Sequence, residues 1–466
     1  MTVIKSISGI RGVIGGLPGK GLTPVDIVNY TAAFAVFIKN QHPGQSCSMV
    51  VGRDARVTGK MVEHIVVGTL QSMGIDVIDL GLSTTPTVEV AVEDTKAAGG
   101  IIITASHNPA QWNALKLLNG KGEFINDAQG RQVIELADTG NFDFATYNHI
   151  GKYQRIENYH QSHIERILAL PLVDTDAIKK ANFHVVVDGV NSTGGIVIPA
   201  LLRALGVQKI DELFCEPNGH FPHNPEPLPE NLSEISELVV KRNAHLGFVV
   251  DPDVDRLAIV DENGDMFGEE YTLVAVADYV LKHQKGNTVS NLSSSKALQV
   301  ITEKHGGKYF ASAVGEVNVV EMMKKQNAVI GGEGNGGIIY PALHYGRDAL
   351  VGIALFLTHL AKSAKSCSAL RATYPDLHIS KNKIQLDSGM DLDKILARIQ
   401  EKYHNQPSNT IDGIRIEFGD DWVHLRKSNT EPIIRIYAES DSMHKAGVLA
   451  NKLIDDIREI IKEGRE

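Results

Sequence analysis

Residues 101–109 place a serine hydroxyl directly after an expected strand. Three β-branched residues predict a buried strand, and the polar residues that follow predict a tight loop leaving the sheet. We expect this loop to expose Ser106, with His107 beside it, at a sheet edge where a rigid scaffold can hold reacting groups. A serine hydrolase is a weaker interpretation, because Gly-x-Ser-x-Gly is absent and adjacent residues rarely place an imidazole on the neighbouring hydroxyl. A polar turn without chemistry is the structural alternative.

Three aspartates at alternate positions, Asp251, Asp253 and Asp255, follow the apolar residues 247–250, which predict a buried strand. Side chains at alternate positions of an extended segment point the same way, so these carboxylates would repel one another without a cation among them. Three hard oxygen ligands favour Mg²⁺. The spacing approaches that of an EF-hand calcium loop, but its sixth position is Arg256 where glycine is needed, and both flanks predict strands. A solvated acidic turn is the remaining alternative.

Two further loops carry groups that suit a sugar and a phosphate. Glu333 and Asn335 lie among the glycines of residues 331–337, where a carboxylate and an amide can approach hydroxyl groups closely, although a tight turn is equally compatible. Residues 426–432 offer a guanidinium, two hydroxyls and backbone amides between two expected strands, and Arg435 adds a second guanidinium. This combination suits a phosphate, with a charged surface hairpin as the alternative.

Composition and charge describe the class of protein. The 466 residues carry 43% hydrophobic and 22% charged residues, which is typical of a soluble globular chain of about three domains. A formal net charge of −10 disfavours nucleic-acid binding and favours small-molecule partners. Cys47, Cys215 and Cys367 fit neither a disulfide framework nor a zinc site, so we expect a reducing compartment. Without a leader-like or membrane-spanning apolar stretch, we expect a cytoplasmic protein; oligomeric state has no sequence signal.

The hydrophobic periodicity predicts repeated α/β units. A helix capped by Thr23 should run from Pro24 to about residue 39, followed by a strand, helix and strand up to residue 80. The same order recurs after residues 185–187 and again after residues 289–292, which indicates a diverged repeat on periodicity alone. Four prolines in residues 222–229 predict a surface connection, and the pattern after residue 375 predicts a separate α+β domain.

In this order, the four loops resemble those of the α-D-phosphohexomutase family over essentially the whole chain. The resemblance implies three similar α/β domains with mixed sheets and a C-terminal α+β domain around a central cleft. We place these domains at residues 1–150, 151–253, 254–372 and 373–466.

The resemblance also implies a role for each loop. Ser106 corresponds to the residue that carries the phosphoryl group, and with Asp251, Asp253 and Asp255 it corresponds to the Mg²⁺ site. The expected catalytic neighbours are Arg11 in the N-terminal loop of residues 8–12, His107, Lys116 and Arg256. The expected sugar-binding residues are Glu333 and Asn335, and the expected phosphate-binding residues are Arg426, Ser428, Asn429 and Thr430, with Arg435.

The implied activity interconverts hexose 6-phosphate and hexose 1-phosphate through phosphoserine at Ser106 and a hexose 1,6-bisphosphate. The sugar loop of many members reads Gly-Glu-x-Ser-Gly-His, whereas this chain has Asn335 for the serine and Gly337 for the histidine. We expect glucosamine phosphate as the substrate, with mannose or glucose phosphate as alternatives. A non-catalytic sugar-phosphate-binding protein is the other class, and the intact serine, aspartates and phosphate loop disfavour it.

Overall fold

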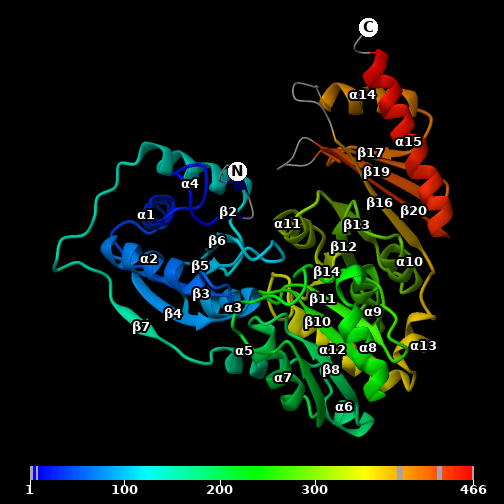
Figure 1. Ribbon diagram of the computed structural model, residues 1–466, viewed down its shortest axis with the longest axis horizontal. Helices are drawn as coiled ribbons and strands as arrows, with labels where there is room; N and C mark the ends of the chain where they lie inside the picture. The colour runs from blue at the N-terminus through cyan, green and yellow to red at the C-terminus, as the bar shows by residue number, and fades with distance from the viewer. Residues whose placement is uncertain (1–3, 7–8, 386–391, 428–432, 464–466) are drawn as a thin grey trace.

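The computed structural model describes residues 4–6, 9–385, 392–427 and 433–463. The chain forms four successive domains, each built on one sheet (Figure 1). Three of the sheets are mixed and the last is antiparallel, which confirms the predicted fold class. Among the described residues, none of the helices combines the length and apolar character needed to cross a membrane.

The first helix of the first domain, α1, is well capped. Thr23 and Asp26 form a capping box, and Pro24 occupies the first turn, so the predicted start of this helix is confirmed. The elements of this domain are β1 (Ile4–Ser6), β2 (Gly9–Val13), α1 (Pro24–Gln41), β3 (Ser48–Arg53), α2 (Gly59–Ser72), β4 (Asp76–Leu82), α3 (Thr85–Thr95), β5 (Gly99–Ile103), β6 (Trp112–Asn119), α4 (Asp127–Thr139) and β7 (Tyr153–Arg155).

The second and third domains pack against one another and share one large hydrophobic core. The second contains α5 (His160–Leu168), α6 (Thr175–Ala181), β8 (His184–Asp188), α7 (Gly194–Ala204), β9 (Lys209–Leu213), η1 (Pro229–Asn231), α8 (Ser233–Arg242), β10 (Leu246–Val250) and β11 (Leu257–Asp261). The third contains α9 (Glu269–His283), β12 (Asn287–Asn291), α10 (Ala297–Lys304), β13 (Tyr309–Ser312), α11 (Glu316–Gln326), β14 (Ala328–Glu333), β15 (Gly337–Ile339), α12 (Ala349–Ser363) and α13 (Cys367–Arg371).

One strand order recurs in all three mixed sheets. The neighbours are β4-β3-β5-β6 in the first sheet, β9-β8-β10-β11 in the second and β13-β12-β14-β15 in the third. In each set the first three strands are parallel and the fourth is antiparallel to the third. The turn between the third and fourth strands therefore occupies the equivalent position in each of the three sheets. The loops with Ser106, with the three aspartates and with the sugar-loop glycines all lie at this point.

The fourth domain is a five-stranded antiparallel sheet covered by two helices. Its elements are β16 (His378–Gln385), α14 (Leu392–Lys402), β17 (Ser408–Asn409), β18 (Ile414–Phe418), β19 (Asp421–Lys427), β20 (Ile433–Ser440) and α15 (Met443–Glu463). Ile434, Ile436 and Ala438 alternate along β20 and are buried with the apolar face of α15, where Leu453 and Ile457 lie. Each fully buried aliphatic side chain contributes roughly 1.5–3 kcal/mol, so this face holds the domain together.

Polar contacts tie the fourth domain to the third, beside α11 and β13 in Figure 1. Arg415 NH1 donates to the Leu292 carbonyl at 2.8 Å, and His424 Nδ1 lies 2.9 Å from Ser293 Oγ. The backbone N–H of Lys296 donates to Glu439 Oε1 at 2.9 Å. These bonds join the fourth domain to the third beside the carboxyl end of β12.

Helix α3 is one of the elements that the sequence patterns did not predict. Val88, Val90 and Val92 alternate with other residues as in a strand, but Thr84 caps the segment as a helix by accepting from the Thr87 N–H at 3.1 Å. The helix is buried on all sides from Thr85 to Val92, so its burial pattern shows no helical period. Tertiary packing therefore decides its structure.

Candidate active site

Ser106 lies on the floor of a pocket rather than on an exposed loop. Its side chain is only 7% exposed, so the predicted exposure is wrong; the second and third domains cover the loop. Its φ of 49° is in the left-handed region, which is uncommon for a residue other than glycine and is found mainly where surrounding structure enforces it. The Ser106 N–H donates to Thr104 Oγ1 at 2.9 Å, which helps to hold this conformation.

Arg56 makes most of the hydrogen bonds that hold the Ser106 loop in this conformation. This side chain is 1% exposed, and its guanidinium donates to four carbonyls of the Ser106 loop. The four acceptors are Ser106 at 2.5 Å, Asn108 at 2.6 Å, Pro109 at 2.8 Å and Trp112 at 3.0 Å. Asp54 Oδ2 accepts from Arg56 Nε at 3.0 Å and from Thr104 Oγ1 at 2.7 Å. The loop is therefore folded around one buried cation.

The three aspartates lie directly against this serine. Ser106 Oγ donates to Asp251 Oδ2 at 2.7 Å, and ligand oxygens of Asp251, Asp253 and Asp255 lie within 4.8 Å of one another. All three side chains are fully buried. The first domain holds their loop as well, because Thr85 donates from its backbone N–H to the Asp253 carbonyl and from Oγ1 to Asp253 Oδ2, at 2.9 and 2.6 Å.

The carboxylate oxygens fit a divalent cation. Asp253 Oδ1 and Asp255 Oδ1 are buried and have no hydrogen-bond partner among the described residues, which is a costly arrangement for charged oxygens unless a cation binds there. Burial, together with repulsion from Asp255 and Asp253, raises the pKa of Asp251 well above its ordinary value. Oxygen ligands of this kind suit a hard cation, so the triad can hold a metal ion.

Two protein cations already neutralise part of this charge. Lys116 Nζ lies 2.7 Å from Asp253 Oδ2 and 3.4 Å from Asp255 Oδ2, and Arg347 NH2 donates to Asp255 Oδ2 at 2.8 Å. Burial opposes the charged form of Lys116, but Asp253 and Asp255 raise its pKa overall. Burial also opposes ionisation of Asp255, yet Arg347 and Lys116 lower its pKa. Lys116 and Asp255 therefore stay ionised at neutral pH.

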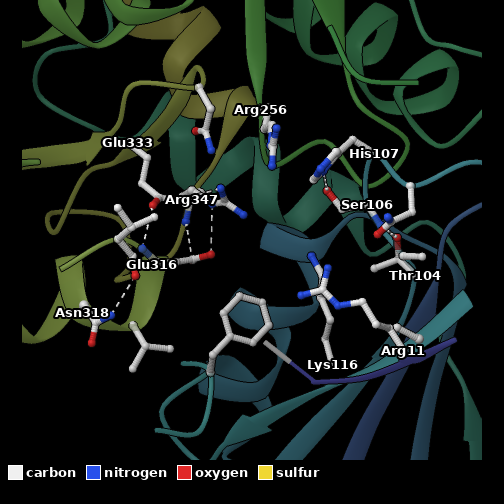
Figure 2. A pocket seen from close by; sticks show the side chains of 18 residues that line it. Arg11, Thr104, Ser106, His107, Lys116, Arg256, Glu316, Asn318, Glu333 and Arg347 are labelled. Carbon is white, nitrogen blue, oxygen red and sulfur yellow. Dashed lines mark hydrogen bonds and ion pairs between the residues drawn. The ribbon is translucent and has the colours of Figure 1, made fainter. Parts of the chain in front are cut away.

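A pocket of about 310 Å³ opens above Ser106 where the first three domains meet. In Figure 2 the Ser106 loop and Arg11 face Glu316, Glu333 and Arg347 across the pocket. The expected residues that line it are Arg11, Ser106, His107, Lys116, Arg256, Glu333 and Asn335. The structure thus brings together expected residues from loops more than 200 positions apart in the sequence.

His107 is a neutral base in this pocket. Its Nδ1 lies 3.2 Å from Ser106 Oγ. Burial, reinforced by the charge of Arg256, lowers the pKa of His107 well below its ordinary value. Burial and the charge of Arg256 also lower the pKa of Arg11. Two guanidiniums beside a neutral imidazole create a positive field that suits a phosphate group.

The sugar loop presents a carboxylate whose oxygens are already oriented. Glu333 Oε1 accepts from Asn291 Nδ2 at 2.9 Å and from the Gly315 N–H at 3.0 Å, and Oε2 accepts from Arg347 NH1 at 2.8 Å. Asn335 Oδ1 accepts from the Gly337 N–H at 3.2 Å, which leaves the amide nitrogen of Asn335 as a donor. The loop therefore offers both an acceptor and a donor to a hydroxyl-rich ligand.

The structure describes part of the expected phosphate-binding set, namely Arg426 and Arg435. Ser428, Asn429 and Thr430 are outside the described residues. Arg426 and Arg435 are register partners on β19 and β20, and neither is among the described residues that line the Ser106 pocket. Arg426 Nε is buried and has no hydrogen-bond partner among the residues that the structure describes, and Asp412 Oδ2 is 3.7 Å away.

Sequence reasoning missed the buried cations that hold the loops, and two neighbours in the pocket. Arg56 follows β3 by three residues, at the same edge of the sheet as Ser106, and this position could have indicated it. Arg347 has no such signal, because its carboxylate partners are 14, 31 and 92 residues away in the sequence. Glu316 and Asn318 are two further polar residues that line the pocket and were not predicted.

Among the described residues, one other group has metal-ligand chemistry: His163, His344 and Asp348. The Nε2 atoms of the two histidines lie 3.0 and 3.2 Å from Asp348 Oδ2, and Asp348 Oδ1 accepts from the first N–H groups of α12. These hydrogen bonds account for the cluster without a metal. Since His163 belongs to α5, they tie the second domain to the third.

The geometry of the Ser106 pocket defines a class of enzyme. A hydroxyl in contact with a carboxylate triad and surrounded by buried cations suits phosphoryl transfer, in which a metal and cations stabilise charge on the transferred group. It does not suit a serine hydrolase, because His107 and Ser106 are sequence neighbours and Asp251 contacts the serine rather than the imidazole.

Comparison with known proteins agrees with this class. Sequence profiles of phosphoglucomutase/phosphomannomutase match in order, with alpha/beta/alpha domain I at residues 4–143, domain II at 161–264, domain III at 268–377 and the C-terminal domain at 383–456. A phosphoglucomutase/phosphomannomutase from Thermococcus kodakarensis is 37% identical over 93% of this chain and 94% of its own length. The phosphoglucosamine/phosphogalactosamine mutase of Sulfurisphaera tokodaii is 31% identical over 97% and 98%.

A solved structure shows the same arrangement. The crystal structure of a phosphoglucomutase/phosphomannomutase family protein from Burkholderia thailandensis has a TM-score of 0.83 at 26% identity, and the match covers 99% of this chain and 98% of that one. The chain belongs to the phosphoglucomutase/phosphomannomutase family, the α-D-phosphohexomutases. It is a mutase of the isomerase class.

Proposed function

We propose that the protein interconverts hexose 6-phosphate and hexose 1-phosphate through phosphorylated Ser106 and a hexose 1,6-bisphosphate. The observation that carries the proposal is the 2.7 Å contact between Ser106 Oγ and Asp251 in a pocket that also holds Arg11, Lys116 and Arg256. Phosphoryl transfer needs an acceptor oxygen, a cationic surround and protection from water, and this buried serine has all three.

The proposed reaction has two half-reactions, each of which transfers one phosphoryl group. In the first half-reaction the bond between Ser106 Oγ and phosphorus breaks while a bond forms to the free hydroxyl of the sugar phosphate. The proton of that hydroxyl ends on Ser106 Oγ, and His107, a neutral base 3.2 Å from this oxygen, is placed to carry it. The second half-reaction reverses these steps on the other phosphate of the bisphosphate.

A divalent cation fits the aspartate triad. Asp251, Asp253 and Asp255, together with the oxygen on Ser106, would hold Mg²⁺, which would neutralise charge on the oxygens of the transferred phosphoryl group. Lys116 and Arg347 contact Asp253 and Asp255 and orient their carboxylates for this role.

The other phosphate of the substrate would bind in the fourth domain, at Arg426 with Ser428, Asn429 and Thr430, and Arg435 would add charge. This proposal requires the fourth domain to approach the pocket when the ligand binds, as lids do in many enzymes. Arg426 Nε supports it, because this buried nitrogen has no acceptor within the described part of the chain and can donate a hydrogen bond to an anion.

Glucosamine phosphate is the proposed substrate, with mannose and glucose phosphates as alternatives. The relatives carry both kinds of name, so one assay should compare the three sugars. We also infer a cytoplasmic location, which three free cysteines and a net charge of −10 support.

The test combines mass spectrometry with that assay. We expect the intact protein to carry a phosphoryl adduct that Ser106→Ala removes, and we expect the variant to lose turnover of all three 6-phosphates with trace 1,6-bisphosphate present. Ser366→Ala, which removes an exposed helix cap, is the matched control and should keep both adduct and turnover. Normal turnover by Ser106→Ala would refute the proposal.

A further inference from the structure

Arg347 is the most connected side chain of the pocket, and no expected loop contains it. It lies between β15 and α12, is mostly buried, and uses each of its three nitrogens on a different carboxylate. Figure 2 shows two of these carboxylates, those of Glu316 and Glu333, beside Arg347. The Nε atom donates to Glu316 at 3.1 Å, NH1 donates to Glu333 at 2.8 Å and NH2 donates to Asp255 at 2.8 Å. One guanidinium thus joins the sugar loop to the metal triad.

The path of Arg347 to Glu333 crosses Gly337. Gly337 is the register partner of Glu333 in the β14–β15 pair, and Arg347 forms a bridge with Ile339 on the same strand. A Cβ atom on residue 337 would stand 2.4 Å from Arg347 Cδ. Arg347 cannot simply swing aside, because three ion pairs fix its far end. Any side chain at position 337 would therefore displace Arg347.

This contact explains the departure noted in the sugar loop. Where many members of the family have histidine, this chain has Gly337, and the arginine from the start of α12 fills the space beside Glu333. Glu333 then has three fixed donors, Asn291, Gly315 and Arg347. Since an ionised carboxylate has about four acceptor positions, roughly one is left for a sugar hydroxyl.

We propose that Arg347 is a positioning residue that sets sugar selectivity by holding Glu333 in register with Asp255, and that Gly337 is glycine because Arg347 must pass over it. The inference rests on the proposed mutase function and adds to it the residue pair that decides which hydroxyl Glu333 reads. The ligand class is an aldohexose phosphate whose hydroxyl donates to the remaining acceptor position of Glu333.

The first measurement is the ratio of kcat/KM for glucose 6-phosphate to that for mannose 6-phosphate. These two sugars differ only in the configuration of one hydroxyl group. Arg347→Ala frees Glu333 to turn, so we expect this ratio to move at least fivefold toward one, in addition to a loss of turnover of tenfold or more. Arg347→Lys keeps the charge, but its single ammonium group cannot bind three carboxylates as a guanidinium does. The sugar ratio of Arg347→Lys should therefore fall between those of the unmodified protein and Arg347→Ala.

Gly337→Ala tests the crossing. Alone, it should shift the sugar ratio as Arg347→Ala does, because the new methyl group displaces the same side chain. In the Arg347→Ala background it should have little further effect, since the space is then empty. The proposal would be overturned if the changes in sugar ratio caused by Gly337→Ala and by Arg347→Ala multiplied in the double variant. An unchanged sugar ratio in Arg347→Ala would also overturn it.

A matched control separates selectivity from stability. Arg155 also bridges two carboxylates, Asp79 at 2.7 Å and Glu63 at 3.3 Å, but does so in the first domain away from the pocket. Arg155→Ala should lower the melting temperature and leave the sugar ratio unchanged. The same four-variant cycle read as affinity for glucose and mannose 1,6-bisphosphates needs no turnover. If the unmodified protein were inactive, the proposed function would fail, while this binding cycle would still decide the role of Arg347.

Discussion

Replacing Arg56 should disturb the Ser106 loop more than any other single change outside the pocket. Arg56→Ala removes four hydrogen bonds to loop carbonyls and leaves Asp54 buried without its cation. Breaking a buried ion pair by removing one partner costs about 3–5 kcal/mol. Burial already raises the pKa of Asp54 although Arg56 opposes this, so Asp54 can take up a proton and keep the loss within that range.

The effect on turnover follows from the backbone of Ser106. A residue other than glycine in the left-handed region carries about 1–2 kcal/mol of strain, and Arg56 holds the Ser106 carbonyl that defines this conformation. Without Arg56 the loop can relax, and a misplacement of about 1 Å can reduce turnover on the order of 100-fold. We therefore expect a large fall in kcat from a residue that does not line the pocket.

Hydrogen exchange of the peptide spanning residues 104–112 is the most direct assay, because a chain of four domains does not unfold in one step. We expect this peptide to lose protection in Arg56→Ala, while peptides of the fourth domain keep theirs. Arg131→Ala, which removes an exposed pair with Asp127 on one turn of α4, is the control and should change neither exchange nor kcat. Unchanged exchange in residues 104–112, with kcat within twofold of the unmodified protein, would refute this account.

Three further predictions concern the metal, the fourth domain and the phosphate. Asp253→Asn should lower kcat much more than it raises KM, because the cation acts on the transition state; equal activity with and without Mg²⁺ would contradict this. Burial lowers the pKa of His424 to about 4, so the folded protein resists a proton that the unfolded chain accepts below about pH 6.5. Stability should therefore be full above that pH and fall by about 3 kcal/mol as the pH drops toward 4, and thermal unfolding of His424→Gln should show a weaker dependence. Arg426→Ala should raise KM for all three hexose phosphates by a similar factor above roughly tenfold, and an effect confined to one sugar would place Arg426 at the sugar instead.

The sequence alone determined features that depend on near neighbours in the chain. The capping box of Thr23 and Asp26 fixes the start of α1 within three residues. Polar residues that directly follow an apolar strand must leave the sheet, so the positions of Ser106, Asp253 and Glu333 at strand ends were readable from pattern. The change of pattern after residue 375 likewise separated the fourth domain from the repeated ones.

The tertiary structure decided everything that depends on distant partners. The strand-like valines of α3 form a helix because the segment is buried on all sides. Ser106 is buried because other domains cover its loop, which no local pattern can indicate. Arg347 contacts Asp255, which is 92 residues away in the sequence. Position 337 has no room for a side chain because Arg347 packs against it. Hydrophobic period and turn chemistry act over a few residues, whereas ion pairs and close packing depend on which surfaces the fold brings together.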